Sequence, residues 1–331
     1  MTTPTAPDYR DRGTGLVVFG VAEILLGVFF ALGIPLMLFA QMAAPHGPDS
    51  PPRPQIFSAL TVYAVSAVAL VWLGIGSILA RRWARAILLS LSGAALCAGT
   101  LGFVFLCFIM PHMFDAIAHN GPRPIPPGAL LLIKVVAVTF MSLYVLIPLS
   151  IFLFYRSPHV KRTCEARDPV ERWTDRCPLP VLALCLLLGF GGIIALGVLG
   201  NFHGFPLFGM YVSGGAGYLV VVLAAALAFY LARGLYRLQV GAWWAAMGML
   251  LLSAASNAVT FLGGDVGGTY EKMGLDRRAV ALIQQMFAAP YIKWMIPLSV
   301  LPWLIWLLYV RRYFTAPAAP PVLTDGPPLN Q

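Results

Sequence analysis

One acidic residue, Glu23, stands inside a long apolar stretch near the start of the chain. A carboxyl group within a membrane segment is costly and by default suggests a function. Gly20 and Gly27 lie three residues before and four residues after Glu23, so the three share one helix face, and glycines let helices approach closely. We therefore expect Glu23 to face protein near the middle of the membrane, and to be largely neutral unless a cation is near.

Two roles are open for Glu23. It can bind a proton or a ligand, or it can make a structural hydrogen bond to another helix, for which Tyr144 lies at a similar depth. Asn257 gives a later span a polar stripe together with Ser253 and Ser256, and interhelical hydrogen bonding is the simpler interpretation of that stripe. Glu23, Tyr144 and Asn257 are the candidate ligand or proton residues.

Two short motifs place prolines inside apolar stretches: Ile147-Pro148-Leu149-Ser150 and Ile296-Pro297-Leu298-Ser299. A proline removes a backbone donor and kinks a helix, which frees a carbonyl group that Ser150 or Ser299 can help to satisfy. Paired broken helices can indicate a transporter site. An inherited packing kink or a hinge is the alternative for Pro148 and Pro297.

His112, Asp115 and His119 have a spacing that would place them on one helix face. The two histidines would lie about 10.5 Å apart along the axis, which is long for one metal ion, so Asp115 with either neighbour is the more plausible ligand pair. We predict no cofactor, and no hydrolase motif is present to indicate a catalytic set. Lys134 and Lys293 are expected to be interfacial anchors that extend toward the headgroups.

The segments that must position these residues are long and apolar. Because a membrane span needs about 20 residues, eight stretches qualify. They lie near residues 15–42, 57–80, 86–110, 129–155, 179–200, 208–232, 241–263 and 289–310. The sequence therefore predicts an all-α polytopic membrane protein with eight transmembrane helices.

Three echoes suggest that the eight spans are two parallel four-helix repeats. The stretch 31–34 resembles 195–198, Leu79-Ala80-Arg81 matches residues 231–233, and the two proline motifs match each other. Four spans per repeat keep both copies in one orientation, related by an axis along the membrane normal. Leu187 takes the place of Glu23 in the second copy, so a site at Glu23 would be asymmetric.

The expected organisation follows from these boundaries. It comprises a cytoplasmic tail at 1–14, a first repeat at 15–155, a cytoplasmic linker at 156–178, a second repeat at 179–313 and a disordered, proline-rich tail at 314–331. With both termini in the cytoplasm, fifteen basic residues fall on the inner side and five on the outer side, as the positive-inside rule requires. A bacterial-type inner (plasma) membrane is the expected location.

The composition excludes soluble and nucleic-acid-binding classes. Hydrophobic residues make up 59% of the 331 residues, charged residues make up 11%, and the net charge of +9 comes from residues at the inner helix ends. The expected partners are the lipid bilayer, and other membrane proteins or further copies of this chain. The leading hypothesis is a non-catalytic structural or accessory membrane subunit. The alternatives are a small-solute or lipid transporter that uses Glu23, and a membrane enzyme with an outer-side metal site.

Overall fold

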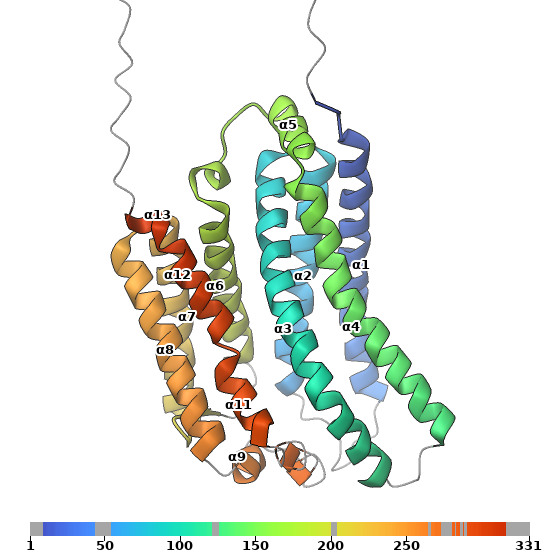
Figure 1. Ribbon diagram of the computed structural model, residues 1–331, viewed down its shortest axis with the longest axis vertical. Coiled ribbons are helices and arrows are strands. Elements are labelled where there is room, and N and C mark those ends of the chain that lie inside the picture. Colours follow the sequence, from blue (N-terminus) through green and yellow to red (C-terminus); the bar gives the residue numbers. More distant parts are fainter. Residues whose placement is uncertain are drawn as a thin grey trace, which may run out of the picture.

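Eight apolar helices form the body of the protein. The computed structural model describes residues 9–43, 54–120, 126–199, 204–263, 266–272, 280–281, 283–284, 287 and 290–315. Within these residues, eight helices are long and apolar enough to cross a membrane, and they stand side by side (Figure 1). The prediction of an all-α, multi-pass membrane protein is therefore confirmed.

The helices fall into two groups along the chain. The first group contains α1 (Gly13–Ala43), α2 (Pro54–Ile78), α3 (Arg82–Asn120) and α4 (Pro127–Arg156). The second group contains α6 (Leu179–Val198), α7 (Gly214–Tyr236), α8 (Val240–Gly263) and the broken pair α11 (Pro290–Leu298) and α12 (Leu301–Val310). Proline at the first or second position of α4, α6 and α12 fits these helix starts, because the missing N–H would have had no partner there.

Short elements occupy both ends of the bundle. Helix α5 (Pro158–Arg167) and the 3₁₀ helix η1 (Trp173–Arg176) join the two groups, and α13 (Arg312–Thr315) follows α12. We call this the linker end, and the chain enters and leaves there (Figure 1). At the opposite end lie α9 (Val266–Lys272) and a hairpin of β1 (Phe205–Leu207) and β2 (Met210–Val212), which pair antiparallel.

The hairpin corrects one predicted boundary. The sixth span was expected to begin near residue 208, but β2 occupies Met210–Val212 and α7 begins at Gly214. Phe208 and Gly209 both have positive φ, +50° and +76°, as the tightest hairpin turns require. Glycine supplies this conformation at one of the two positions, and Phe208 has to adopt it with a side chain.

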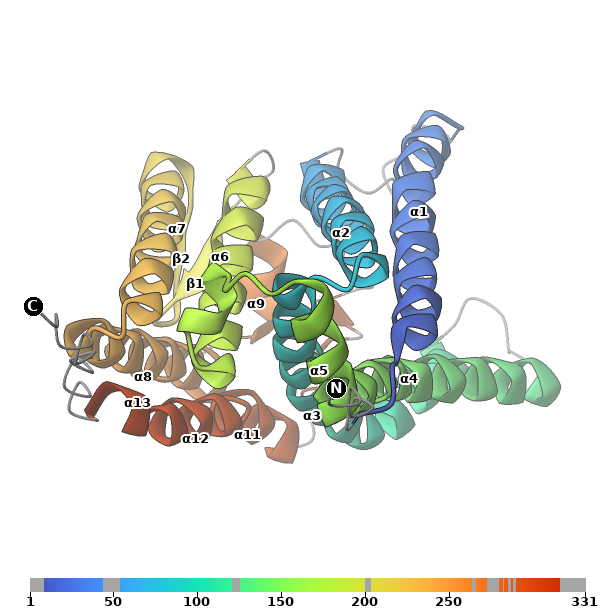
Figure 2. The same cartoon turned by 90° about the horizontal axis from the view of Figure 1, so that it is seen from above.

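Each group is built from tightly packed pairs. In the first group α1 packs on α2 and α3 on α4, and in the second α6 packs on α7 and α8 on α11 and α12 (Figure 2). The groups meet where α6 contacts α2 and α3, and where α11 contacts α3. In the two predicted repeats α1, α2 and α3 correspond to α6, α7 and α8. A twofold axis would therefore place α1 against α7 and α8 just as α6 lies against α2 and α3, and the described residues show no comparable contact. The expected axis along the membrane normal is therefore not observed at this interface.

Matching turns end the second helix of each group. Ala80 and Leu238 both have positive φ, +50° and +54°. The N–H of the next residue, at 81 or 239, donates to the carbonyl of Gly76 or Gly234 at 2.9 and 3.0 Å. This pattern is the Schellman cap of a helix C-terminus. The matching sequences at residues 79–81 and 231–233 therefore do not occupy equivalent positions in the two groups. Residues 79–81 lie in the turn, whereas residues 231–233 lie inside α7.

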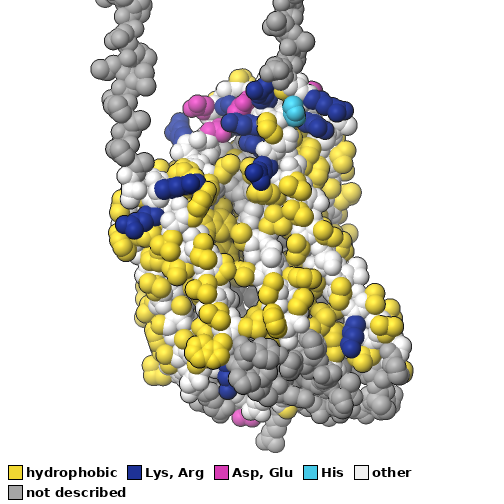
Figure 3. Space-filling view, viewed as in Figure 1, with side chains coloured by type: hydrophobic (Ala, Val, Ile, Leu, Met, Phe, Trp, Pro, Cys, Tyr) yellow, Lys and Arg dark blue, Asp and Glu magenta, His cyan; other side chains and the backbone are white. Residues whose placement is uncertain are grey.

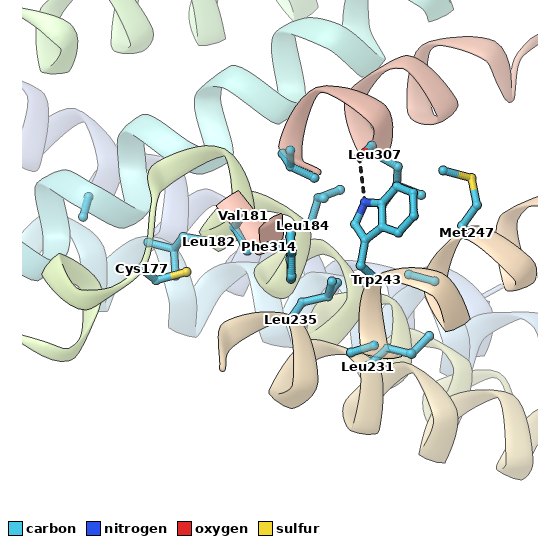
Figure 4. Close-up of a cluster of buried hydrophobic side chains, with 14 residues drawn as sticks. Cys177, Val181, Leu182, Leu184, Leu231, Leu235, Trp243, Met247, Leu307 and Phe314 are labelled. Carbon is cyan, nitrogen blue, oxygen red and sulfur yellow. Dashed lines mark hydrogen bonds between the residues drawn. The ribbon is translucent and has the colours of Figure 1, made fainter. Parts of the chain in front are cut away.

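Buried apolar side chains form one cluster in each group. In the second group Leu231, Leu235, Trp243 and Leu307 pack together near the linker end (Figure 4). The Trp243 indole Nε1–H donates to the Leu307 carbonyl at 2.8 Å, so the ring has a fixed orientation against α12. The cluster of the first group includes Leu16, Leu73 and Tyr155, and residues of α5 extend it to the linker.

Candidate functional site

Glu23 lies where α1 and α2 cross most closely. Its side chain is 3% exposed. A Cβ atom added to Gly20 would stand 2.7 Å from the Gly74 carbonyl oxygen, and one added to Gly27 would stand 3.0 Å from the Ala67 carbonyl oxygen. The first distance is shorter than any Cβ contact tolerates and the second is tighter than most, so the two glycines permit this helix crossing. The prediction that Glu23 faces protein on a glycine-lined side of its helix is confirmed.

Tyr155, from the last turn of α4, is the partner of Glu23. Its hydroxyl oxygen lies 3.2 Å from Glu23 Oε1 and also contacts Ser77 Oγ of α2. Ser77 Oγ in turn donates to the Leu16 carbonyl at 3.1 Å. Tyr155 and Ser77 are both at most 1% exposed. The carboxyl group is therefore connected to the last turn of α4, and its depth near the middle of the membrane stays a prediction.

The hydroxyl groups of Tyr155 and Ser77 link the carboxyl group to the backbone. The Tyr155 O–H donates to Glu23 Oε1, and the Ser77 O–H donates to the Leu16 carbonyl oxygen. Either hydroxyl group can be the donor in the contact between Tyr155 and Ser77. The hydrogen-bond chain therefore begins at Glu23 and ends on the backbone of the same helix.

The second oxygen of the Glu23 carboxyl group, Oε2, is buried and has no hydrogen-bond partner among the described residues. An unpaired but neutral carbonyl oxygen costs roughly 1–3 kcal/mol, whereas an unpaired buried charge costs far more. The neutral form is therefore the less costly one for a carboxyl group in this position.

Tyr144 does not join this site. Its side chain is 58% exposed, and its ring lies over Gly99 of α3, where an added Cβ atom would stand 3.3 Å from a ring carbon. The proposed hydrogen bond from Tyr144 to Glu23 is therefore wrong. The side chain of a helical residue extends toward the N-terminus of its helix, so Glu23 reaches toward the linker end, while Tyr144 lies about three turns from Tyr155.

Two hydroxyl groups of α8, those of Ser256 and Thr260, hold the hairpin. Ser256 Oγ accepts the Phe208 N–H and Thr260 Oγ1 accepts the Gly209 N–H, both at 3.0 Å. The two hydroxyls therefore satisfy the backbone of the hairpin turn. Asn257, one residue further round the helix, is half-buried and makes no hydrogen bond within the described part of the chain.

The two proline motifs differ in structure. Helix α4 continues through Pro148, and Ser150 Oγ donates to the Leu146 carbonyl at 2.8 Å. That carbonyl is not the one that Pro148 frees, which belongs to Tyr144. In the second group the helix breaks between Leu298 and Leu301, and Ser299 Oγ donates to the Ile296 carbonyl at 2.6 Å.

A second proline explains the break. Pro302 cannot donate to the carbonyl four residues earlier, and it follows Pro297 by only five residues. The matching position of the first motif is Leu153. The two prolines are therefore not in equivalent surroundings, because α4 is continuous through Pro148 whereas the helix of the second group is interrupted after Leu298.

The remaining candidates are only partly covered by the structure. Lys134 is exposed, and its Nζ lies 5.3 Å from the centre of the Phe114 ring, an arrangement that suits an interfacial anchor. Lys293 is half-buried in α11. The side chains of the candidate metal ligands, His112, Asp115 and His119, lie outside the described residues. No cluster of potential metal ligands occurs among the side chains that are described.

An ion-pair network ties the linker to the turn between α2 and α3. Asp168 is buried and binds Arg172 at 2.8 Å and Arg81 at 3.7 Å, while its Oδ2 accepts the Arg82 N–H at 3.3 Å. The hydrogen bonds from Arg172 lower the pKa of Asp168 below its ordinary value, and the bond from the Arg82 backbone lowers it further, against the opposite effect of burial.

Two further carboxylates complete this network, which we call the linker clasp. Arg82 pairs with Glu165 at 3.5 Å and with Asp175 at 3.9 Å. Acidic and basic side chains are mixed at this end of the first group (Figure 3). The sequence indicated the mixture of charges but not which charges pair.

Comparisons with protein families, with curated proteins and with solved structures found no match to this chain.

Proposed function

We propose that this protein is a non-catalytic structural or accessory component of a membrane. The observation that carries the proposal is the hydrogen-bond chain of Glu23, which joins α1, α2 and α4 and ends on the Leu16 carbonyl. In this role the only membrane-embedded acid among the described helices fixes how α1 sits against its neighbours. Polar groups buried in this way can specify one packing arrangement over others.

The surroundings of Glu23 favour this role over transport. The carboxyl group is enclosed by close glycine contacts, and neither of the two cavities described below, one in the second group and one between α3 and α11, has Glu23 in its wall. A transport site requires a path for its substrate to the binding group. Glu23 sits instead in tightly packed surroundings.

Proton flux in vesicles tests the proposal. The protein is reconstituted with a trapped pH-sensitive dye, and the wild type is compared with Glu23→Gln and with the control Tyr144→Phe. We expect no Glu23-dependent flux and an unchanged yield of folded Glu23→Gln, because the amide oxygen keeps an acceptor for the Tyr155 hydroxyl. Flux that Glu23→Gln abolishes while its folded yield stays unchanged would overturn the proposal.

One observation favours the alternative of a transporter. The unpartnered Glu23 Oε2 is a free acceptor in the middle of a buried network, as a proton site would need. The same flux measurement distinguishes the two functions. The other alternative, an enzyme with a metal site at His112, Asp115 and His119, predicts bound zinc, iron or copper in the purified protein, which elemental analysis would detect.

We also propose that the two groups arose by duplication. The matched Schellman caps support this, because they superimpose the residues around Gly76 and Gly234 with a constant offset. An added Cβ atom at Gly76 would meet Ala84, and one at Gly234 would meet Ala242, at the same offset. The contact of α6 with α2 and α3 fits copies placed head to tail with the same orientation, in place of a twofold pair.

The orientation of the chain is proposed from its charges. The linker end carries most of the basic residues of the described helices, so we place that end and both termini in the cytoplasm, in a bacterial-type inner (plasma) membrane. The lipid-facing surface of the helices leaves room for other membrane proteins or further copies of this chain as partners.

A further inference from the structure

The second group contains a cavity of about 190 Å³. Its walls come from four helices, with Leu187 and Leu188 of α6, Leu235 of α7, Ala246 of α8, and Trp303 and Leu307 of α12 among them. Apolar cavities of about 150 Å³ stay dry and hold a molecule of the size of benzene. The cavity is therefore large enough for a segment of hydrocarbon chain.

The cavity is closed toward the linker end and more open further from it. Leu235 and Leu307, which lie nearest the linker end, are 0% and 6% exposed. Leu188 and Trp303, which lie deeper in the bundle, are only half-buried. A ligand therefore enters from the side, from within the bilayer, and not from the aqueous phase at the linker end.

Arg311 stands one helical turn beyond Leu307, at the linker end of the cavity. Its guanidinium group lies 5.4 Å from the centre of the Trp243 ring and 5.8 Å from that of Trp244. The same Trp243 ring is held by its hydrogen bond to the Leu307 carbonyl (Figure 4). The cation is thus held in place beside the cavity wall while its outer side stays exposed.

Within the described part of the chain, the arginines at this end of the second group have no carboxylate partners. In the first group the linker clasp neutralises Arg81 and Arg82. In the second group no described carboxylate pairs with any of the four arginines at the helix ends, Arg233, Arg237, Arg311 and Arg312. The sequence from residue 178 to residue 264 contains no Asp or Glu at all. Figure 3 shows basic side chains near α13 with no acidic side chain beside them.

We propose that the second group binds one anionic phospholipid from the leaflet at the linker end, with its phosphate on Arg311 and a segment of acyl chain in the cavity. The positive charge of Arg311 favours an anionic group, and the apolar cavity, which opens to the side, favours a hydrocarbon chain. Arg311 and Trp303 are eight residues apart, about 12 Å along the helix, so a chain that starts at the headgroup reaches the open part of the cavity. Basic pockets between helices bind anionic headgroups in the same manner.

Lipid titration followed by native mass spectrometry tests this site. The detergent-purified full chain is titrated with phosphatidylglycerol, with phosphatidylcholine of the same chains, and with inorganic phosphate. We expect one phosphatidylglycerol to bind at least ten-fold more tightly than phosphatidylcholine, and phosphate not to displace it. Equal affinity for the two lipids, or full displacement by phosphate, would overturn the proposal.

Variants distinguish the contribution of the lipid headgroup to binding from that of the acyl chain. Arg311→Gln should remove the preference for phosphatidylglycerol, and Arg311→Lys should keep most of it. The matched control is Arg156→Gln, which removes an exposed arginine that also lies over an aromatic ring, Phe152, at the linker end of the first group. Ala246→Leu fills the cavity and should weaken the binding of both lipids. An effect of Arg156→Gln as large as that of Arg311→Gln, or tight binding to a folded Ala246→Leu variant, would contradict the assignment.

Discussion

Replacing Tyr155 with phenylalanine tests the hydrogen bond at Glu23. In the wild type the change removes the only partner that the described residues give to this buried carboxyl group, which should cost about 2 kcal/mol of the free energy of unfolding. In a Glu23→Leu background the same change leaves Ser77 donating to the Leu16 carbonyl and leaves no group unpaired. There we expect a loss below about 1 kcal/mol, which gives a coupling energy of at least 1 kcal/mol between the two positions.

Reversible unfolding in mixed micelles, followed by tryptophan fluorescence, measures these free energies. Glu23→Leu alone should be nearly neutral, because Tyr155 can then donate to Ser77 and no buried charge is created. Tyr144→Phe is the control, and it should stay within about 0.5 kcal/mol of the wild type since its side chain is exposed. Additive effects at Glu23 and Tyr155, with a coupling energy below about 0.5 kcal/mol, would refute the hydrogen-bond chain as we describe it.

Three other predictions concern the helix contacts, the linker clasp and the hairpin. Gly20→Leu should prevent α1 from packing on α2, because even a Cβ atom at this position would stand 2.7 Å from a carbonyl oxygen, and size-exclusion chromatography should then show little folded protein. The pKa of Asp168 is lowered in the folded state, so its contribution to stability is complete above about pH 4 and is lost as the pH falls through the folded value; unfolding curves from pH 7 to pH 3 should show a smaller acid loss in Asp168→Asn. Thr260→Val leaves the Gly209 N–H unpaired and should speed amide exchange at the hairpin turn by about ten-fold, while exchange along α1 stays unchanged.

The sequence predicted the spans well because length and hydropathy alone decide them. It also predicted the face of Glu23, since the spacing of Gly20 and Gly27 follows directly from the helix period. The partner of Glu23 was missed because depth was counted along the backbone. Tyr155 lies near the end of α4, but its long side chain and that of Glu23 cover the distance between their helices.

The hairpin and the broken helix show a different limit. Residues 205–212 are apolar and run into the next span, so hydropathy could not separate strand from helix. Gly209 and the two hydroxyl groups of α8 are the residues that indicate the hairpin turn. They can be recognised only when the hairpin and α8 are known to be in contact. The proline motifs matched in sequence, but Pro302, outside the motif, decides which helix breaks.

The break between α11 and α12 has a mechanical consequence for the contact between the two groups. No continuous ladder of backbone hydrogen bonds joins the two helices across Ser299 and Val300, so a tilt of α11 is not transmitted stiffly to α12. Helix α11 also borders a cavity of about 400 Å³ against α3, between Phe105 and Ile296. A displacement of α11 toward α3 would therefore meet open space, whereas α12 is held by the hydrogen bond from Trp243 to the Leu307 carbonyl.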